Sequence, residues 1–139
     1  LVNSCGGVVG HIRQYQFAMP QHSLEKTVDE VYKLYPEFSI PPGTIYRQEG
    51  TGYKYDYRIV VINESEQKYA LSFAYVGDSI YWQTHNTSVI SFVAAAKYGE
   101  VLELSKDINW FKKRKFAKLF EKHFIEKVEE VSGVQSTDF

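Results

Sequence analysis

The sequence predicts an α+β fold: an antiparallel sheet of about five to seven strands, with a short N-terminal helix and a long C-terminal helix packed on one face. Residues 53–75 alternate between two faces on either side of a short polar loop, which is typical of a β-hairpin. Turn residues then recur at short intervals up to residue 104, as in an antiparallel meander. From about residue 105, apolar side chains recur at helical spacing.

The first elements are a strand and a helix. Residues 8–18 alternate in part and predict a strand. Ser23 is a suitable N-cap for the helix that follows, and Pro36 ends it because proline cannot continue a helix. The apolar stripe of this helix consists of Leu24, Val28, Val31, Leu34 and Tyr35.

The middle of the chain predicts the sheet. A weak strand at residues 44–49 lies between two glycine-containing turns. The hairpin strands cover residues 53–62 and 69–75, and further strands are predicted at residues 80–85 and 100–104. Residues 88–97 are ambiguous, since three consecutive alanines suit a helix, but the β-branched residues favour a strand.

The longest helix is predicted near the C-terminus. Ser105 or Asp107 can cap it, and it reaches about Val131, with Gly133 as its stop signal. Its length, roughly 35 Å at about 1.5 Å per residue, would cross several strands. Its apolar stripe consists of Phe116, Leu119, Phe120, Phe124, Val128 and Val131. We expect residues 135–139 to be frayed.

Composition describes one ordinary globular domain. The 139 residues include 44% hydrophobic and 24% charged residues, enough for one core. The single cysteine allows no internal disulfide, and no run of about 18 apolar residues predicts a spanning helix. We divide the chain into a tether at 1–7, a domain at 8–133 and a tail at 134–139.

The first five residues, Leu1-Val2-Asn3-Ser4-Cys5, resemble part of a targeting signal. An apolar residue three positions before a cysteine and a small residue just before it resemble the end of a bacterial lipobox, from which Asn3 departs. The resemblance implies a lipid on Cys5 and a bacterial envelope lipoprotein, membrane-anchored and facing the periplasm. It covers five residues and says nothing about the folded domain, and the alternative for Cys5 is an unmodified surface thiol.

Basic residues cluster at the start of the long predicted helix, where the helix dipole disfavours them. They are Lys112, Lys113, Arg114, Lys115, Lys118 and Lys122. The functional interpretation is contact with a membrane or with an acidic protein partner, and the alternative is a solvated helix face. The net charge of −1 and the lack of a recognition motif give no support to nucleic-acid binding.

Aromatic residues are abundant, with 11 tyrosines and two tryptophans. An aromatic sheet face beneath a long helix is more often core than a ligand cleft. Tyr81 and Trp82 are set apart as candidates for exposed recognition, because their predicted strand lies far from the helix.

No motif indicates catalysis, a metal or a cofactor. The four histidines are scattered, and the sequence contains no HExxH, CxxC or GxSxG run. The leading hypothesis is therefore a non-enzymatic binding or scaffold domain that acts through protein contacts. One alternative is a carrier of an apolar small molecule between the helix and the sheet. Another is a hydrolase built around Asp78, Tyr81 and His85.

Overall fold

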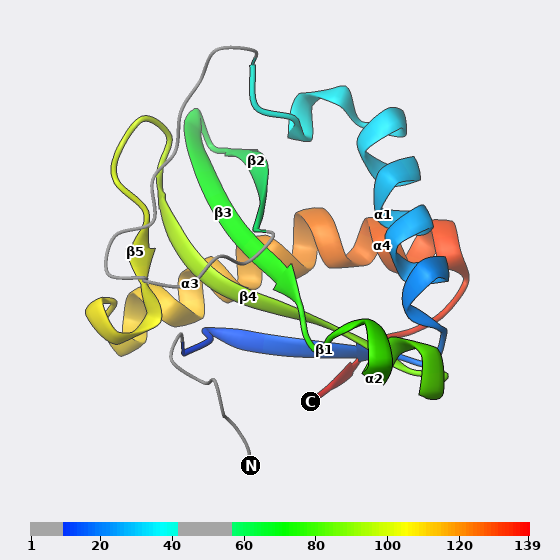
Figure 1. Ribbon diagram of the computed structural model, residues 1–139. Coiled ribbons are helices and arrows are strands. Elements are labelled where there is room, and N and C mark those ends of the chain that lie inside the picture. The colour runs from blue at the N-terminus through cyan, green and yellow to red at the C-terminus, as the bar shows by residue number, and fades with distance from the viewer. Residues whose placement is uncertain (1–9, 42–56) are drawn as a thin grey trace.

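The structure is a computed structural model that describes residues 10–41 and 57–139. The described residues form a six-stranded antiparallel sheet in the order β2-β3-β4-β1-β6, with β5 paired to β4 (Figure 1). The strands are β1 (Arg13–Phe17), β2 (Arg58–Glu64), β3 (Gln67–Tyr75), β4 (Ser88–Lys97), β5 (Glu103–Leu104) and β6 (Thr137–Asp138). The helices are α1 (Gln21–Leu34), α2 (Ser79–Thr84), α3 (Trp110–Phe120) and α4 (Glu126–Ser132). The predicted α+β class is confirmed.

The main core lies between the sheet and the helices α1, α3 and α4. Phe73 and Phe92 of the sheet are fully buried against Phe120 and Phe124 of the long helix. The Phe92 and Phe120 rings stack with centroids 4.6 Å apart, and Phe73 and Phe124 lie 5.0 Å apart. The aromatic sheet face is therefore core, as the sequence favoured. A smaller cluster on the opposite face contains only strand and loop residues.

The hairpin of β2 and β3 has a tighter turn than its polar loop suggested. Glu64 pairs with Gln67, so only Ser65 and Glu66 form the turn. Both have positive φ, 48° and 68°. Such a turn matches the twist of a hairpin, but it normally carries Asn-Gly because other residues are strained there.

The ambiguous segment at residues 88–97 is a strand, β4, as predicted. It pairs with β3 and β1, and only Lys97 at its end is exposed. A strand covered on both faces does not need alternating polarity, which explains its continuous apolar run. Its pairing with β3 shifts between Ser72 and Phe73, a bulge that bends the strand.

The long C-terminal helix is confirmed and runs from Trp110 to Ser132, across the back of the sheet in Figure 1. Its N-cap is Asn109, whose side chain accepts a hydrogen bond from the Lys112 amide at 2.9 Å. The predicted caps, Ser105 and Asp107, instead bound a preceding 3-10 turn, η3 (Ser105–Asp107). A π-helical segment, η4 (Glu121–Ile125), joins α3 to α4, and Gly133 ends α4 at φ 75° as expected.

The helix α1 ends before Pro36 as predicted, but it begins at Gln21, so Ser23 is not its N-cap. It is fixed to the sheet edge by Tyr32, whose hydroxyl donates to the Ile59 carbonyl at 2.6 Å. Arg58 forms an ion pair with Asp29 at 2.8 Å.

Four further predictions differ from the structure. Residues 80–85 are not a strand, because Asp78 caps α2 by accepting from the Tyr81 amide at 2.9 Å. The strand predicted at residues 8–18 is only Arg13–Phe17 within the described part, and the one at 100–104 is only Glu103–Leu104. The tail is not frayed at Thr137–Asp138, which pair with β1. The strand predicted at 44–49 lies outside the described residues.

Candidate functional site

The outer face of α3 and the tip of the β2–β3 hairpin border an open, shallow groove with a volume of about 500 Å³. We call it the α3 groove. Its lining consists of Glu64, Phe111, Arg114, Lys115, Lys118, Leu119 and Lys122. It combines four cations, one carboxylate and two apolar side chains, so it is a basic surface with an apolar component.

Helical geometry explains which members of the basic cluster meet here. At 3.6 residues per turn, residues 111, 115, 118 and 122 fall on one face. The opposite face carries Phe116 and Phe120, which are buried in the core. Four of the six predicted basic residues therefore line the α3 groove, whereas Lys112 and Lys113 do not.

Two exposed aromatic residues lie at the start of the same helix. The Trp110 and Phe111 side chains remain 62% and 77% exposed, and their ring centroids are 5.1 Å apart. The Arg114 guanidinium lies over the Trp110 ring at 5.3 Å. Large exposed aromatics beside arginine are typical of protein contact surfaces, because both residue types are enriched at interface centres.

Most of the positive charge on this face has no ion-pair partner among the described residues. No ion pair within residues 10–41 and 57–139 involves Arg114, Lys115 or Lys118. The first turn of α3 contains no acidic residue to offset the helix dipole. Lys115 instead lies over the ring of Tyr69, at 5.2 Å.

Glu64 is the acidic member of the α3 groove. Its Oε2 is 2.6 Å from His123 Nε2 and 3.7 Å from Lys122 Nζ. The His123 hydrogen bond, with a smaller effect of Lys122, lowers the pKa of the Glu64 carboxyl below its ordinary value of 4.5. An ionised carboxylate only accepts hydrogen bonds, so His123 donates from Nε2.

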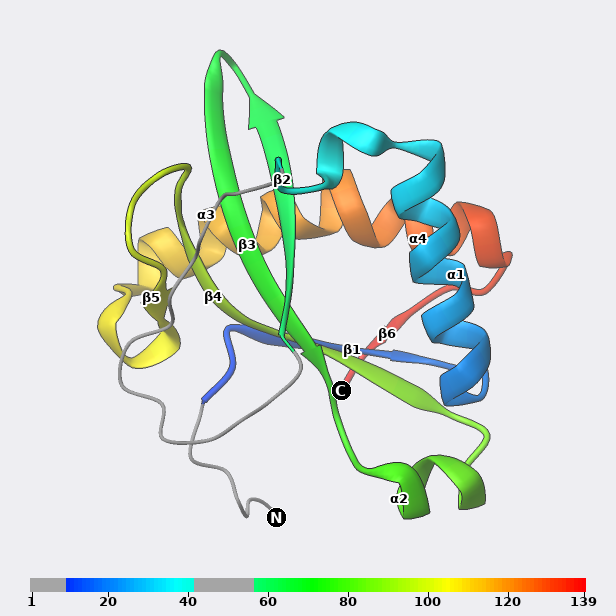
Figure 2. The ribbon, with the colours of Figure 1, turned by 45° about the horizontal axis from the view of Figure 1, so that its top comes forward.

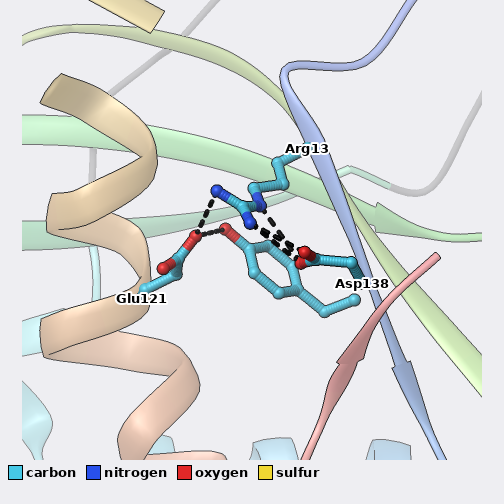
Figure 3. Close-up of polar contacts among 4 residues, drawn as sticks. Arg13, Glu121 and Asp138 are labelled. Atoms are coloured by element: carbon cyan, nitrogen blue, oxygen red, sulfur yellow. Dashed lines mark hydrogen bonds and ion pairs between the residues drawn. The ribbon is translucent and has the colours of Figure 1, made fainter. Parts of the chain in front are cut away.

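A second cluster of polar side chains joins the C-terminal strand β6 to β1, and joins β1 to the π-helical segment η4. Arg13 of β1 donates to both carboxylate oxygens of Asp138, at 3.0 and 2.9 Å, and pairs with Glu121 at 3.3 Å (Figure 3). The Tyr15 hydroxyl donates to the same Glu121 carboxylate at 2.8 Å. Burial, and then this hydrogen bond, raises the pKa of the Tyr15 hydroxyl. The cluster holds β6 on β1 and positions η4, which carries both Glu121 and His123.

The predicted recognition aromatics lie elsewhere, on α2, at the opposite end of β3 from the hairpin tip (Figure 2). Both are half-buried. The Trp82 indole donates to the Val76 carbonyl at 2.7 Å, and the Tyr81 ring stacks on His85 at 3.7 Å. The Asp78 carboxylate is used as the helix cap, and His85 Nδ1 contacts the Tyr81 carbonyl at 2.8 Å. The arrangement of Asp78, Tyr81 and His85 is a helix cap and a ring stack, which gives the hydrolase hypothesis no support.

The carrier hypothesis gains no support from the sheet and helix interface. Phe73, Phe92, Phe120 and Phe124 fill it with close ring contacts. Each of these four rings is fully buried, so none of them offers exposed surface to a ligand.

No group of three metal-ligating side chains occurs among the residues that the structure describes. Within the same part of the chain, no helix combines the length and apolarity needed to span a membrane. Cys5 lies outside the described residues. The chain matches no known family model, no curated protein and no solved structure. Its function must therefore be argued from the site itself.

Sequence reasoning identified the basic residues but missed Trp110, Phe111 and Glu64 as their neighbours. The exposure of Trp110 and Phe111 could have been predicted from the helical spacing of the apolar residues. Extending the buried stripe of α3 backwards from Phe116 leads to positions 112 and 113, which leaves 110 and 111 on the outer side. Glu64 had no such signal, because only tertiary packing brings the hairpin tip to the helix.

Proposed function

We propose that this chain is a non-enzymatic binding module of a bacterial envelope lipoprotein, and that it acts through protein contact at the α3 groove. The observation that carries the proposal is that four cations, the apolar side chain of Leu119 and two exposed aromatic residues occur together on the outer side of α3. Surfaces of one charge attract and orient a partner of the opposite charge. The partner is therefore an acidic segment of polypeptide.

The shape of the site favours a protein segment over a flat membrane. A polypeptide can lie along the groove and cover the exposed Phe111 side chain, whereas a bilayer surface can reach mainly the rim.

The proposed anchor is consistent with this surface. The Ser105 hydroxyl donates to the His11 carbonyl at 3.0 Å, so the chain enters the fold beside the turn that precedes α3. Cys5 is five residues before Gly10 and reaches no more than about 18 Å from it. A lipid on Cys5 would then hold the α3 groove close to the membrane, available to partners there.

The test is a fluorescence anisotropy titration of a fluorescein-labelled decaglutamate peptide with the full chain. Reversing two groove charges, Lys115→Glu with Lys118→Glu, should weaken binding at least about tenfold. The matched control is Lys112→Glu with Lys113→Glu, which changes the net charge equally outside the groove. We expect this control to weaken binding several-fold less.

Equal weakening by the two double variants would contradict the proposal, because only overall charge would then matter. Vesicles of phosphatidylglycerol provide the other arm. Groove-dependent binding to these vesicles without binding to the peptide would replace the protein partner with a membrane surface.

A further inference from the structure

The Glu64 carboxylate occupies a position in the α3 groove that a carboxylate of the proposed partner could also occupy. It projects from the hairpin tip towards the helix, and its Oε2 contacts both His123 and Lys122. These two residues occupy consecutive positions in η4. The His123 contact is a hydrogen bond to an ionised carboxylate, and such charge-assisted bonds are shorter and stronger than neutral ones. The Lys122 contact is a longer ion pair.

Of the four groove cations, Glu64 forms an ion pair only with Lys122. The other three cations, Arg114, Lys115 and Lys118, form no ion pair in the described part of the chain. Phe111 and Leu119 contribute apolar surface to the same groove. The groove therefore divides into a carboxylate subsite, which Glu64 fills, and a basic and apolar subsite that no acidic residue of the described ranges fills.

Resting on the proposed function, we infer that Glu64 is an internal competitor. The partner is an acidic polypeptide with interspersed apolar residues, one carboxylate of which replaces Glu64 at His123 and Lys122. Its apolar side chains contact Phe111, and its further carboxylates meet the other cations.

The hairpin tip is built so that this exchange costs little. Glu64 is the last residue of β2, adjacent to the two-residue turn. Ser65 and Glu66 occupy left-handed conformations that are strained for residues with a Cβ. The Glu64 side chain is itself 31% exposed, so solvent already competes for its carboxylate.

The charge on Glu64 must be separated experimentally from its position. Glu64→Gln removes the charge, and Glu66→Gln makes the same change in the adjacent turn, outside the groove lining. Glu64→Asp keeps the charge but shortens the side chain by one methylene, which withdraws the carboxylate from His123.

Affinity is measured by anisotropy with the full chain and a labelled peptide of repeating Glu-Glu-Leu. We expect Glu64→Gln and Glu64→Asp each to bind about two- to fivefold more tightly than the unmodified chain. Glu66→Gln should change the affinity less. A repeating Glu-Glu-Ser peptide of equal charge should bind more weakly than the leucine peptide, because it cannot use the apolar surface.

Two results would overturn the inference. One is tightening by Glu64→Gln that Glu66→Gln reproduces, which would show a general charge effect. The other is unchanged or weaker binding by Glu64→Asp. Both differ from failure of the proposed function, in which reversal of Lys115 and Lys118 weakens peptide binding no more than reversal of Lys112 and Lys113 does.

Discussion

The contact of Glu64 with His123 joins the hairpin to the long helix through a single carboxylate oxygen. Because the donor is at 2.6 Å, the ionised form of Glu64 is favoured in the folded protein. The carboxylate is partly exposed, with 31% of the side chain accessible, so solvent screens the contact. It is therefore suited to exchange with a ligand more than to holding the fold.

Linkage gives this contact a defined dependence on pH. The folded-state pKa of Glu64 is lowered, so its contribution to stability is present above the unfolded value and is lost as the pH falls through the folded value. We expect Glu64→Gln to be less stable than the unmodified chain at pH 7. Urea unfolding at a series of pH values should show this difference shrinking below about pH 4.5, the ordinary value. A difference that persisted unchanged at pH 3 would show that the carboxylate charge is not its source.

Residues differ in how far the sequence could predict their roles. Lys115, Lys118 and Lys122 were found because a basic cluster is visible along the chain. Glu64 was missed because the residues it contacts are 58 and 59 positions away. The exposure of Trp110 was missed because it depends on where α3 begins. The helix is capped by Asn109 and not by Asp107, so its first residue is Trp110.

At the scale of elements, long periodic segments were predicted best. The helix from Trp110 to Ser132 and the β2–β3 hairpin follow directly from their hydrophobic spacing. The strand β4 could be chosen only from its β-branched residues, because burial on both faces removes alternation. The error at α2 arose because a local cap decided the structure. Asp78 bonds to the Tyr81 amide, and this stabilises a helical turn in a segment rich in strand-forming residues.

The hairpin turn gives a prediction about an element. Glu66 has φ 68°, a conformation that costs a residue with a Cβ roughly 1–2 kcal/mol, which glycine avoids. Glu66→Gly should therefore be about 0.5–1 kcal/mol more stable than Glu66→Ala, even after the entropy that glycine gains on unfolding. Thermal or urea unfolding measures this difference. Equal stabilities of the two variants, which lose the same charge, would mean that the turn is unstrained.

At the scale of the whole molecule, the core and the candidate site occupy opposite sides of one helix. The inner face of α3 contributes Phe116 and Phe120 to the core, and the outer face provides the groove cations. Charge changes in the groove should therefore leave the core intact. The α+β class followed from the element types, whereas the order of strands, with β1 between β4 and β6, had no signal in the sequence.

The proposed anchor is also a property of the whole molecule. If the chain is expressed behind a lipoprotein signal peptide in a bacterium, Cys5 should carry acyl mass and the protein should fractionate with membranes. Cys5→Ala should release it into the soluble fraction. Intact-mass analysis of both proteins checks this. A cysteine-containing product that is free of acyl mass would contradict the anchor and leave the α3 groove unaffected.

The central claim is that the outer face of α3 is the contact surface, and the two tryptophans provide a direct readout of it. Trp110 lies at the start of that face and Trp82 lies on α2, so their indole N–H signals report on separate regions. The decisive measurement is a series of ¹H–¹⁵N spectra of the full chain during titration with decaglutamate. The account predicts that the Trp110 indole signal and the amide signals of residues 111–122 shift, while the Trp82 indole signal stays in place. Movement of the Trp82 signal with an unchanged Trp110 signal would contradict it.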